Sequence, residues 1–174
     1  MNPKKKNNWL LYFFISCFLF SGCGYHLVGT GNTLPSHLKT IYISVFQNTS
    51  SQPEIHRELT RAVLETFIND GRLKLAKKND ADLIMDATLN YYKIRNVSFG
   101  SQDLVSNIII ELGVQLKVTD QVKNKIFMEK QLKTQWDYKS TSDVASTERA
   151  RLEAVDLAFQ DLGRRLVSLL VDQF

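Results

Sequence analysis

The chain has 174 residues and a formal net charge of +4, from 22 basic and 18 acidic residues. This length suits one domain with a single hydrophobic core. The three lysines at positions 4–6 supply most of the positive excess, and the rest of the chain has 19 basic against 18 acidic residues, a balance that argues against nucleic-acid binding.

The first 22 residues have the pattern of a secretory signal peptide. The lysines at positions 4–6 precede an apolar run over residues 9–20, and small residues follow directly before Cys23. A membrane-spanning helix needs about 20 apolar residues, and this apolar run is shorter. We therefore expect residues 1–22 to be cleaved, which would also remove Cys17 and leave no partner for an intramolecular disulfide.

The position of Cys23 directly after the small residues is typical of a bacterial lipoprotein signal. In such a protein the thiol carries a diacylglycerol and the freed amine a further acyl chain such as palmitate, which together hold it stably in a bilayer. Phe20 stands where these signals usually have leucine, so an ordinary signal peptide or an uncleaved anchor helix remains an alternative. Gly24, in place of aspartate, favours the outer membrane, with the protein on its periplasmic side.

The mature chain begins with an expected tether and continues into one domain. Residues 23–38 are rich in glycine and small polar residues, which suits an extended tether after the lipidated cysteine. The domain is expected to span residues 39–174. Its first element is a strand over residues 39–46, in which apolar and polar residues alternate, and turn-forming residues follow at 47–53.

The next segment predicts an amphipathic helix over residues 54–70. Its apolar residues recur at intervals of three and four, Ser51 or Gln52 is the expected N-cap ahead of Pro53, and Gly71 is the expected C-cap. Residues 72–76 could form a short strand.

Three long strands are predicted after a charged turn. They cover residues 83–94, 107–118 and 126–138, and their alternation predicts an antiparallel meander with one buried and one solvated face. The expected buried face of the first of them consists of Leu83, Met85, Ala87, Leu89 and Tyr91.

A long amphipathic helix is predicted over residues 143–172, with Ser142 or Asp143 as its N-cap. The elements together indicate an α+β fold, a two-layer α/β sandwich of βαβββα order with a mixed four-stranded sheet and two helices on one face. The sequence leaves open which strand pairs with the first one.

The sequence gives no pattern for catalysis, a metal or a cofactor. His26, His37 and His56 have no i,i+4 partner and no cysteine or carboxylate at metal-binding spacing. We therefore expect neither an enzyme active site nor a metal site nor a bound cofactor.

Cations and aromatic residues are interleaved along the three long strands and at their ends. The aromatic residues are Tyr92, Phe99, Phe127 and Tyr138, and the cations are Lys93, Arg95, Lys117, Lys125, Lys133 and Lys139. Such a mixture suits a ligand with both phosphate and acyl or sugar parts. The same pattern is also typical of an ordinary solvated sheet face, and both interpretations remain open.

Several motifs resemble one lipoprotein family. Residues 23–27 (CGYHL), Leu34-Pro35 and residues 41–43 (IYI) look like the start of the lipopolysaccharide-assembly family LptE. Residues 45–55, with the pattern VFxNxSxxPxI, and Gly71-Arg72-Leu73 after the helix resemble its non-enterobacterial members.

The resemblance implies a non-enzymatic outer-membrane lipoprotein that assembles with, and plugs, the β-barrel LptD and takes part in lipopolysaccharide insertion into the outer leaflet. Basic strand residues of the family are implicated in binding lipid A phosphates, which implies such a role here for Arg95 and Lys133 and, with them, Lys93 and Lys117. An outer-membrane lipoprotein of another envelope export or polysaccharide secretion system is the alternative, since a fold does not fix function.

Overall fold

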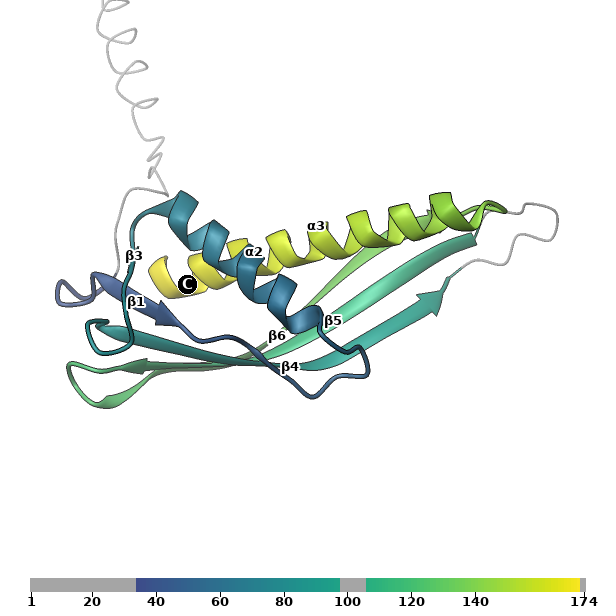
Figure 1. Ribbon diagram of the computed structural model, residues 1–174. Coiled ribbons are helices and arrows are strands. Elements are labelled where there is room, and N and C mark those ends of the chain that lie inside the picture. Colours follow the sequence, from purple (N-terminus) through teal and green to yellow (C-terminus); the bar gives the residue numbers. More distant parts are fainter. Residues whose placement is uncertain (1–33, 98–105, 173–174) are drawn as a thin grey trace, which may run out of the picture. The chain divides into compact units, whose positions relative to one another are not determined.

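The structure is a computed structural model, and it describes residues 34–97 and 106–172, which belong to a compact unit that begins at Asn32. The elements are β1 (Thr40–Ile43), β2 (Gln47–Asn48), α2 (Ile55–Asp70), β3 (Lys74–Leu75), β4 (Leu83–Asn96), β5 (Ser106–Asp120), β6 (Lys125–Ser140) and α3 (Val144–Val171). Both helices lie on the same face of one sheet (Figure 1). None of the helices in the described ranges has the length and apolarity needed to cross a bilayer.

The sheet is mixed and has the order β3-β1-β4-β5-β6, with β2 also beside β4. Strand β1 is parallel to both of its neighbours, and β2 is parallel to β4. Strands β4, β5 and β6 form the antiparallel meander. The expected fold class is therefore confirmed, and the open question of the first strand's partner is answered by β3 and β4.

The sheet has six strands rather than the four expected. One addition, β3, lies within the segment 72–76 that the sequence marked as a possible strand. The other, β2, lies where only a turn was expected. Two residues are too few to show an alternating pattern, so the pairing of β2 becomes visible only in three dimensions.

The core lies between the sheet and the two helices. On β5 the inward side chains are Ile110, Leu112, Val114, Leu116 and Val118, each with 0% exposure. Burial of one such side chain contributes about 1.5–3 kcal/mol, so this strand alone is a major source of stability. Leu34 and Leu38, which fall within the expected tether, are buried in the same core.

A β-bulge in β4 changes which side chains face the helices. Leu89 pairs with Val114 of β5 and Tyr91 pairs with Gly113, so Asn90 is an extra residue without a β5 partner. An extra residue reverses the alternation of the strand beyond it. Tyr92 is therefore buried, and the prediction that Tyr91 continues the buried face is wrong.

The helix ends agree in part with expectation. Helix α2 is preceded by Glu54 in a left-handed conformation (φ 61°) without a side-chain cap, so the expected caps Ser51 and Gln52 are wrong. Gly71 (φ 73°) ends α2 as expected, and its N–H donates to the carbonyl of Phe67 at 3.1 Å. Asp143 caps α3 by accepting the N–H of Ser146 at 3.0 Å, which decides between the two predicted caps.

Candidate functional site

The four described residues predicted to bind ligand all lie on the face of the sheet that the helices leave uncovered. We call this the helix-free face; it consists of the outward side chains of β4, β5 and β6. Lys93 lies opposite Glu111, Arg95 opposite Ile109, Lys117 opposite both Asp86 and Glu129, and Lys133 opposite Gly113. The bulge at Asn90 is the reason that Lys93 and Arg95 point outward, because unbroken alternation from Leu89 would turn both toward the helices. The predicted lipidation site Cys23 lies outside the described residues.

Carboxylates are interspersed among these cations. Along β4, β5 and β6 the outward acidic side chains are Asp86, Glu111, Glu129 and Asp137. A cation and an anion that face each other on neighbouring strands stabilise a sheet by roughly 0.2–1 kcal/mol per pair. The helix-free face is therefore not a uniformly basic surface, and the availability of each cation depends on its neighbours.

Arg95 is already engaged by an acidic partner. Its guanidinium donates to Oε1 of Glu111 from Nη2 at 2.6 Å and from Nε at 2.8 Å. The hydroxyl of Tyr91 donates to Oε2 of the same carboxylate at 3.1 Å. These hydrogen bonds, with that from Arg95 the strongest cause, hold the pKa of Glu111 below its usual range, so this carboxylate stays ionised. Desolvation, and then the bond to Glu111, raise the pKa of Tyr91, so its hydroxyl remains a donor.

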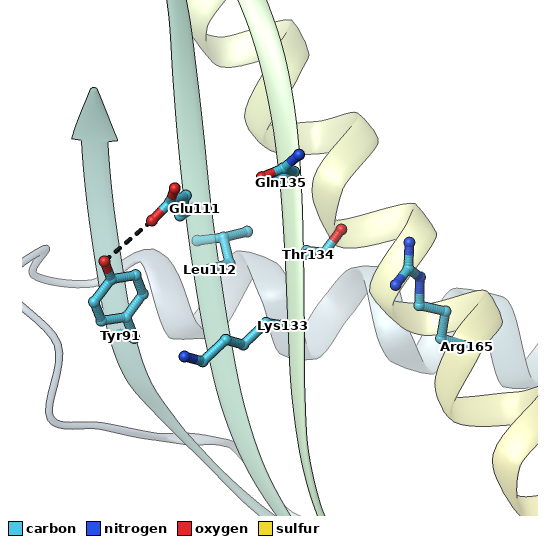
Figure 2. A pocket seen from close by; sticks show the side chains of 7 residues that line it. All are labelled: Tyr91, Glu111, Leu112, Lys133, Thr134, Gln135 and Arg165. Carbon is cyan, nitrogen blue, oxygen red and sulfur yellow. Dashed lines mark hydrogen bonds between the residues drawn. The ribbon is translucent and has the colours of Figure 1, made fainter. Parts of the chain in front are cut away.

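Lys133 is arranged differently from Arg95. Its Nζ lies 5.6 Å from the centroid of the Tyr91 ring, a cation–π distance. No ion pair joins Lys133 to a carboxylate in the described part of the chain. Figure 2 shows this side chain reaching across β5 toward the ring. Lys133 is therefore a predicted ligand-binding cation without an ion-pair partner among the described residues.

An open hollow of about 450 Å³ adjoins Lys133. Its lining residues are Tyr91, Glu111, Leu112, Lys133, Thr134, Gln135 and Arg165 (Figure 2). Gly113 lies between Tyr91 and Lys133 in one cross-strand row and places no side chain in the space between them. A Cβ at Gly113 would lie 2.9 Å from the Cβ of Tyr91, so the close approach of the bulged strand requires glycine.

Sequence reasoning identified only part of this hollow. It named Lys133, but it assigned Tyr91 to the core and did not single out Glu111 or Gln135. A glycine inside the otherwise regular β5 was the available signal, because such a glycine often marks a bulge or a close approach of two backbones.

Lys117 belongs to a separate part of the helix-free face. It lines a second hollow of about 340 Å³ together with Asp86, Glu129, Gln115 and residues near the end of β1. Two carboxylates flank its single charge. The structure therefore places Lys117 on the predicted face but not with Lys133.

The two described histidines lie apart, one before β1 and one on α2. Nε2 of His37 and Oδ2 of Asp120 are joined by a hydrogen bond of 2.9 Å. The side chain of Asp120 is only 1% exposed. His56 lies on α2. Within residues 34–97 and 106–172, no three side chains of histidine, cysteine, aspartate or glutamate are grouped so that they could hold a metal ion.

Comparisons with solved structures find proteins of similar fold. A minor lipoprotein from Acinetobacter baumannii is similar with a TM-score of 0.53 and 14% identity, over 78% of this chain and 93% of that one. A hypothetical protein from Chlamydia trachomatis is similar with a TM-score of 0.54 and 15% identity, over 75% and 94%. At these identities the likeness shows the fold alone. A comparison with curated protein sequences finds no match. The model of the family LptE, described as lipopolysaccharide-assembly, matches residues 38–170, and the chain therefore belongs to the LptE family.

Proposed function

We propose that this protein is an outer-membrane lipoprotein that assembles with and plugs an LptD-type β-barrel, and that it takes part in the transport of lipopolysaccharide to the outer leaflet. The observation that carries the proposal is the family match over residues 38–170. The role is one of binding and assembly, without catalysis, metal or cofactor.

Anchoring depends on Cys23 in this proposal. Cleavage after residue 22 frees the amine of Cys23 for acylation, and its thiol carries the diacylglycerol. Two or three acyl chains hold a protein to a bilayer almost permanently, since each buried CH₂ contributes about 0.8 kcal/mol. The domain is then held on the periplasmic side of the outer membrane by residues 23–38.

Contact with lipopolysaccharide is assigned to the cations of the helix-free face. Lys93, Arg95, Lys117 and Lys133 lie on one uncovered surface, where they can meet the anionic groups of this ligand, its phosphates included. Lys133 has no ion-paired carboxylate, whereas Arg95 is held by Glu111 at 2.6 Å. We therefore expect Lys133 to contribute more to binding than Arg95.

The test measures binding of lipopolysaccharide to the purified full-length lipoprotein in detergent. One variant replaces Lys93, Arg95, Lys117 and Lys133 by glutamine, and a matched control replaces four exposed lysines elsewhere: Lys74, Lys77, Lys78 and Lys130. A charge-assisted hydrogen bond contributes about 1.5–3 kcal/mol, so the first variant should bind at least about tenfold more weakly. The control should bind within about twofold of the parent chain.

Both variants should stay folded, because exposed ion pairs contribute little to stability, and circular dichroism checks this. Equal binding by the two variants would contradict the assignment of the ligand to the helix-free face. Absence of lipopolysaccharide binding by the parent chain would contradict the proposed function itself.

A further inference from the structure

We propose that two cations, Lys130 of β6 and Arg165 of α3, protect the open edge of β6 from pairing with the same edge of a second copy of the chain. We call the side of residues 129–139 that faces away from β5 the β6 edge. The inference goes beyond the proposed function and does not depend on it. It concerns a hazard of that function, because lipid anchors concentrate copies of a protein on one membrane surface.

The β6 edge is long and regular. Strand β6 ends the order of the sheet, so β5 is its one neighbour among the described strands. From Met128 onward, β6 pairs with β5 without a break in register, and its sequence contains neither proline nor glycine. An edge strand presents backbone N–H and C=O groups with which another strand can pair, and proteins prevent this by specific features of the edge.

The charges of β6 on the helix-free face do not by themselves prevent self-pairing. In an antiparallel pair of copies centred on Thr134, Glu129 of each copy lies opposite Lys139 of the other. Opposite charges in such positions stabilise a pair of strands, and no two like charges of residues 129–139 face each other in this register. On the other face of the sheet, Leu132 lies opposite Trp136. Other groups must therefore keep two copies apart.

Lys130 is the first protecting cation. It lies opposite Leu116, so it belongs to the row of β6 that faces the helices, and its neighbours in that row, Met128 and Leu132, are half-buried. Lys130 itself is exposed, and no ion pair holds it in the part of the chain that the structure describes. In the register above, Tyr138 of the second copy lies opposite Lys130 and offers no carboxylate. An added strand would therefore remove water from an unpaired ammonium group, which is costly.

Arg165 is the second protecting cation, and it lies beside the middle of the β6 edge. The hydroxyl of Thr134 donates to Oδ2 of Asp161 at 2.8 Å, and Nε of Arg165 lies 2.8 Å from the same oxygen. Arg164 shares this carboxylate at 3.9 Å, so the three charged groups keep one net positive charge. Figure 2 shows Arg165 on the side of β6 away from β5. Pairing about Thr134 would bring this charge against the same charge of the second copy, which opposes association.

The test removes both cations from the full-length lipoprotein. The variant Lys130→Val with Arg165→Leu is called the uncharged-edge variant. The matched control, Lys77→Val with Arg149→Leu, replaces an exposed lysine and an exposed arginine that lie outside β6. Circular dichroism checks that each variant is folded.

Two readouts follow association in excess detergent over a range of protein concentrations. Sedimentation gives the number of copies in each particle. Fluorescence reports on the β6 edge itself, because Trp136 is the only tryptophan after residue 22 and is half-buried on β6. Covering this side chain moves its emission to shorter wavelength.

We expect the parent chain and the control to stay monomeric over about a hundredfold range of concentration, and the uncharged-edge variant to form dimers within that range. The emission of Trp136 should shift with the dimer. Adding Met128→Lys to the uncharged-edge variant returns a charge to the same row of β6, and it should weaken association at least about tenfold.

Four results would overturn the inference. They are an uncharged-edge variant that stays monomeric, a parent chain that already pairs through β6, equal association of the control, and association that leaves the emission of Trp136 unchanged. Lipopolysaccharide binding enters neither readout, so each of these results leaves the proposed function intact.

Discussion

At the scale of single residues, Asp82 ties the start of β1 to the start of β4. Its Oδ2 accepts hydrogen bonds from the backbone N–H groups of Lys39 and Thr40 and from the hydroxyl of Thr40, each at 2.9 Å. Burial works to raise the pKa of Asp82, but these hydrogen bonds outweigh it and lower the pKa below its usual value. The fold therefore prefers the ionised carboxylate.

This preference predicts a pH dependence of stability. Because the folded pKa of Asp82 is lower than the unfolded value of about 3.9, the stabilisation is present above about pH 4 and is lost as the pH falls through the folded pKa. We expect Asp82→Asn to lower the free energy of unfolding at pH 7 by about 1–3 kcal/mol. The loss should shrink at pH 3, as urea unfolding at the two pH values would show.

A matched control is Asp80→Asn, which changes an exposed aspartate two residues earlier and should leave the free energy of unfolding within about 0.5 kcal/mol. Parallel loss of stability in Asp82→Asn and the parent chain between pH 5 and pH 3 would contradict the role of Asp82. Asp120 contributes a similar dependence in both proteins, because hydrogen bonds from His37 and Lys123 lower its pKa against the opposing effect of burial. The comparison therefore isolates Asp82.

At the scale of elements, periodicity in the sequence was enough to predict the long strands and helices. The alternation of β5 and the helical stripe of α3 are long and regular, and both elements appear within two residues of their expected ends. The periodicity of β4 did not predict the bulge at Asn90, because apolar residues occur on both faces of that strand. The only sign in the sequence was Gly113 on the neighbouring strand. The consequence is large, since it moves Tyr91 into the candidate site.

The candidate site, too, could be predicted from the sequence only in part. The placement of Lys117 and Lys133 on a solvated face follows from the alternation of β5 and β6. The placement of Lys93 and Arg95 on that face requires the bulge. The pairing of Arg95 with Glu111, which removes one expected free cation, depends on strand register, and a sequence without known pairings does not specify the register.

The contact between α2 and α3 allows a prediction at this scale. A Cβ at Gly163 of α3 would lie 2.5 Å from Oγ1 of Thr66 on α2. Alanine in place of glycine ordinarily stabilises a helix by about 1 kcal/mol. Here Gly163→Ala should instead destabilise the protein by about 1–3 kcal/mol, because the added methyl group forces the helices apart.

Thermal unfolding of Gly163→Ala would measure this effect. Glu153→Ala, at an exposed position of the same helix, is the control and should change stability by less than about 0.5 kcal/mol. The double variant Gly163→Ala with Thr66→Ala should recover part of the loss if the contact with Thr66 is its cause. A rise in melting temperature in Gly163→Ala alone would show that the helices separate without cost.

At the scale of the whole molecule, the two faces of the sheet in the described domain differ. One face of the sheet is covered by α2 and α3 and carries the core (Figure 1). The other face is uncovered and carries cations and carboxylates. The hollow beside Gly113 is lined by residues of this face and by Arg165 of α3. Membership of the LptE family points to lipopolysaccharide assembly.

The proposed assembly with a β-barrel is best tested by identifying the proteins that the lipoprotein binds in the cell membrane. The full-length chain would be tagged at its C-terminus, extracted with mild detergent and purified, and the copurifying proteins identified and quantified by mass spectrometry. We expect an outer-membrane β-barrel of the LptD type in about equal amount, lost when Cys23→Ala prevents anchoring. Copurification of a secretin or a polysaccharide transporter in place of that barrel would contradict the proposed assembly.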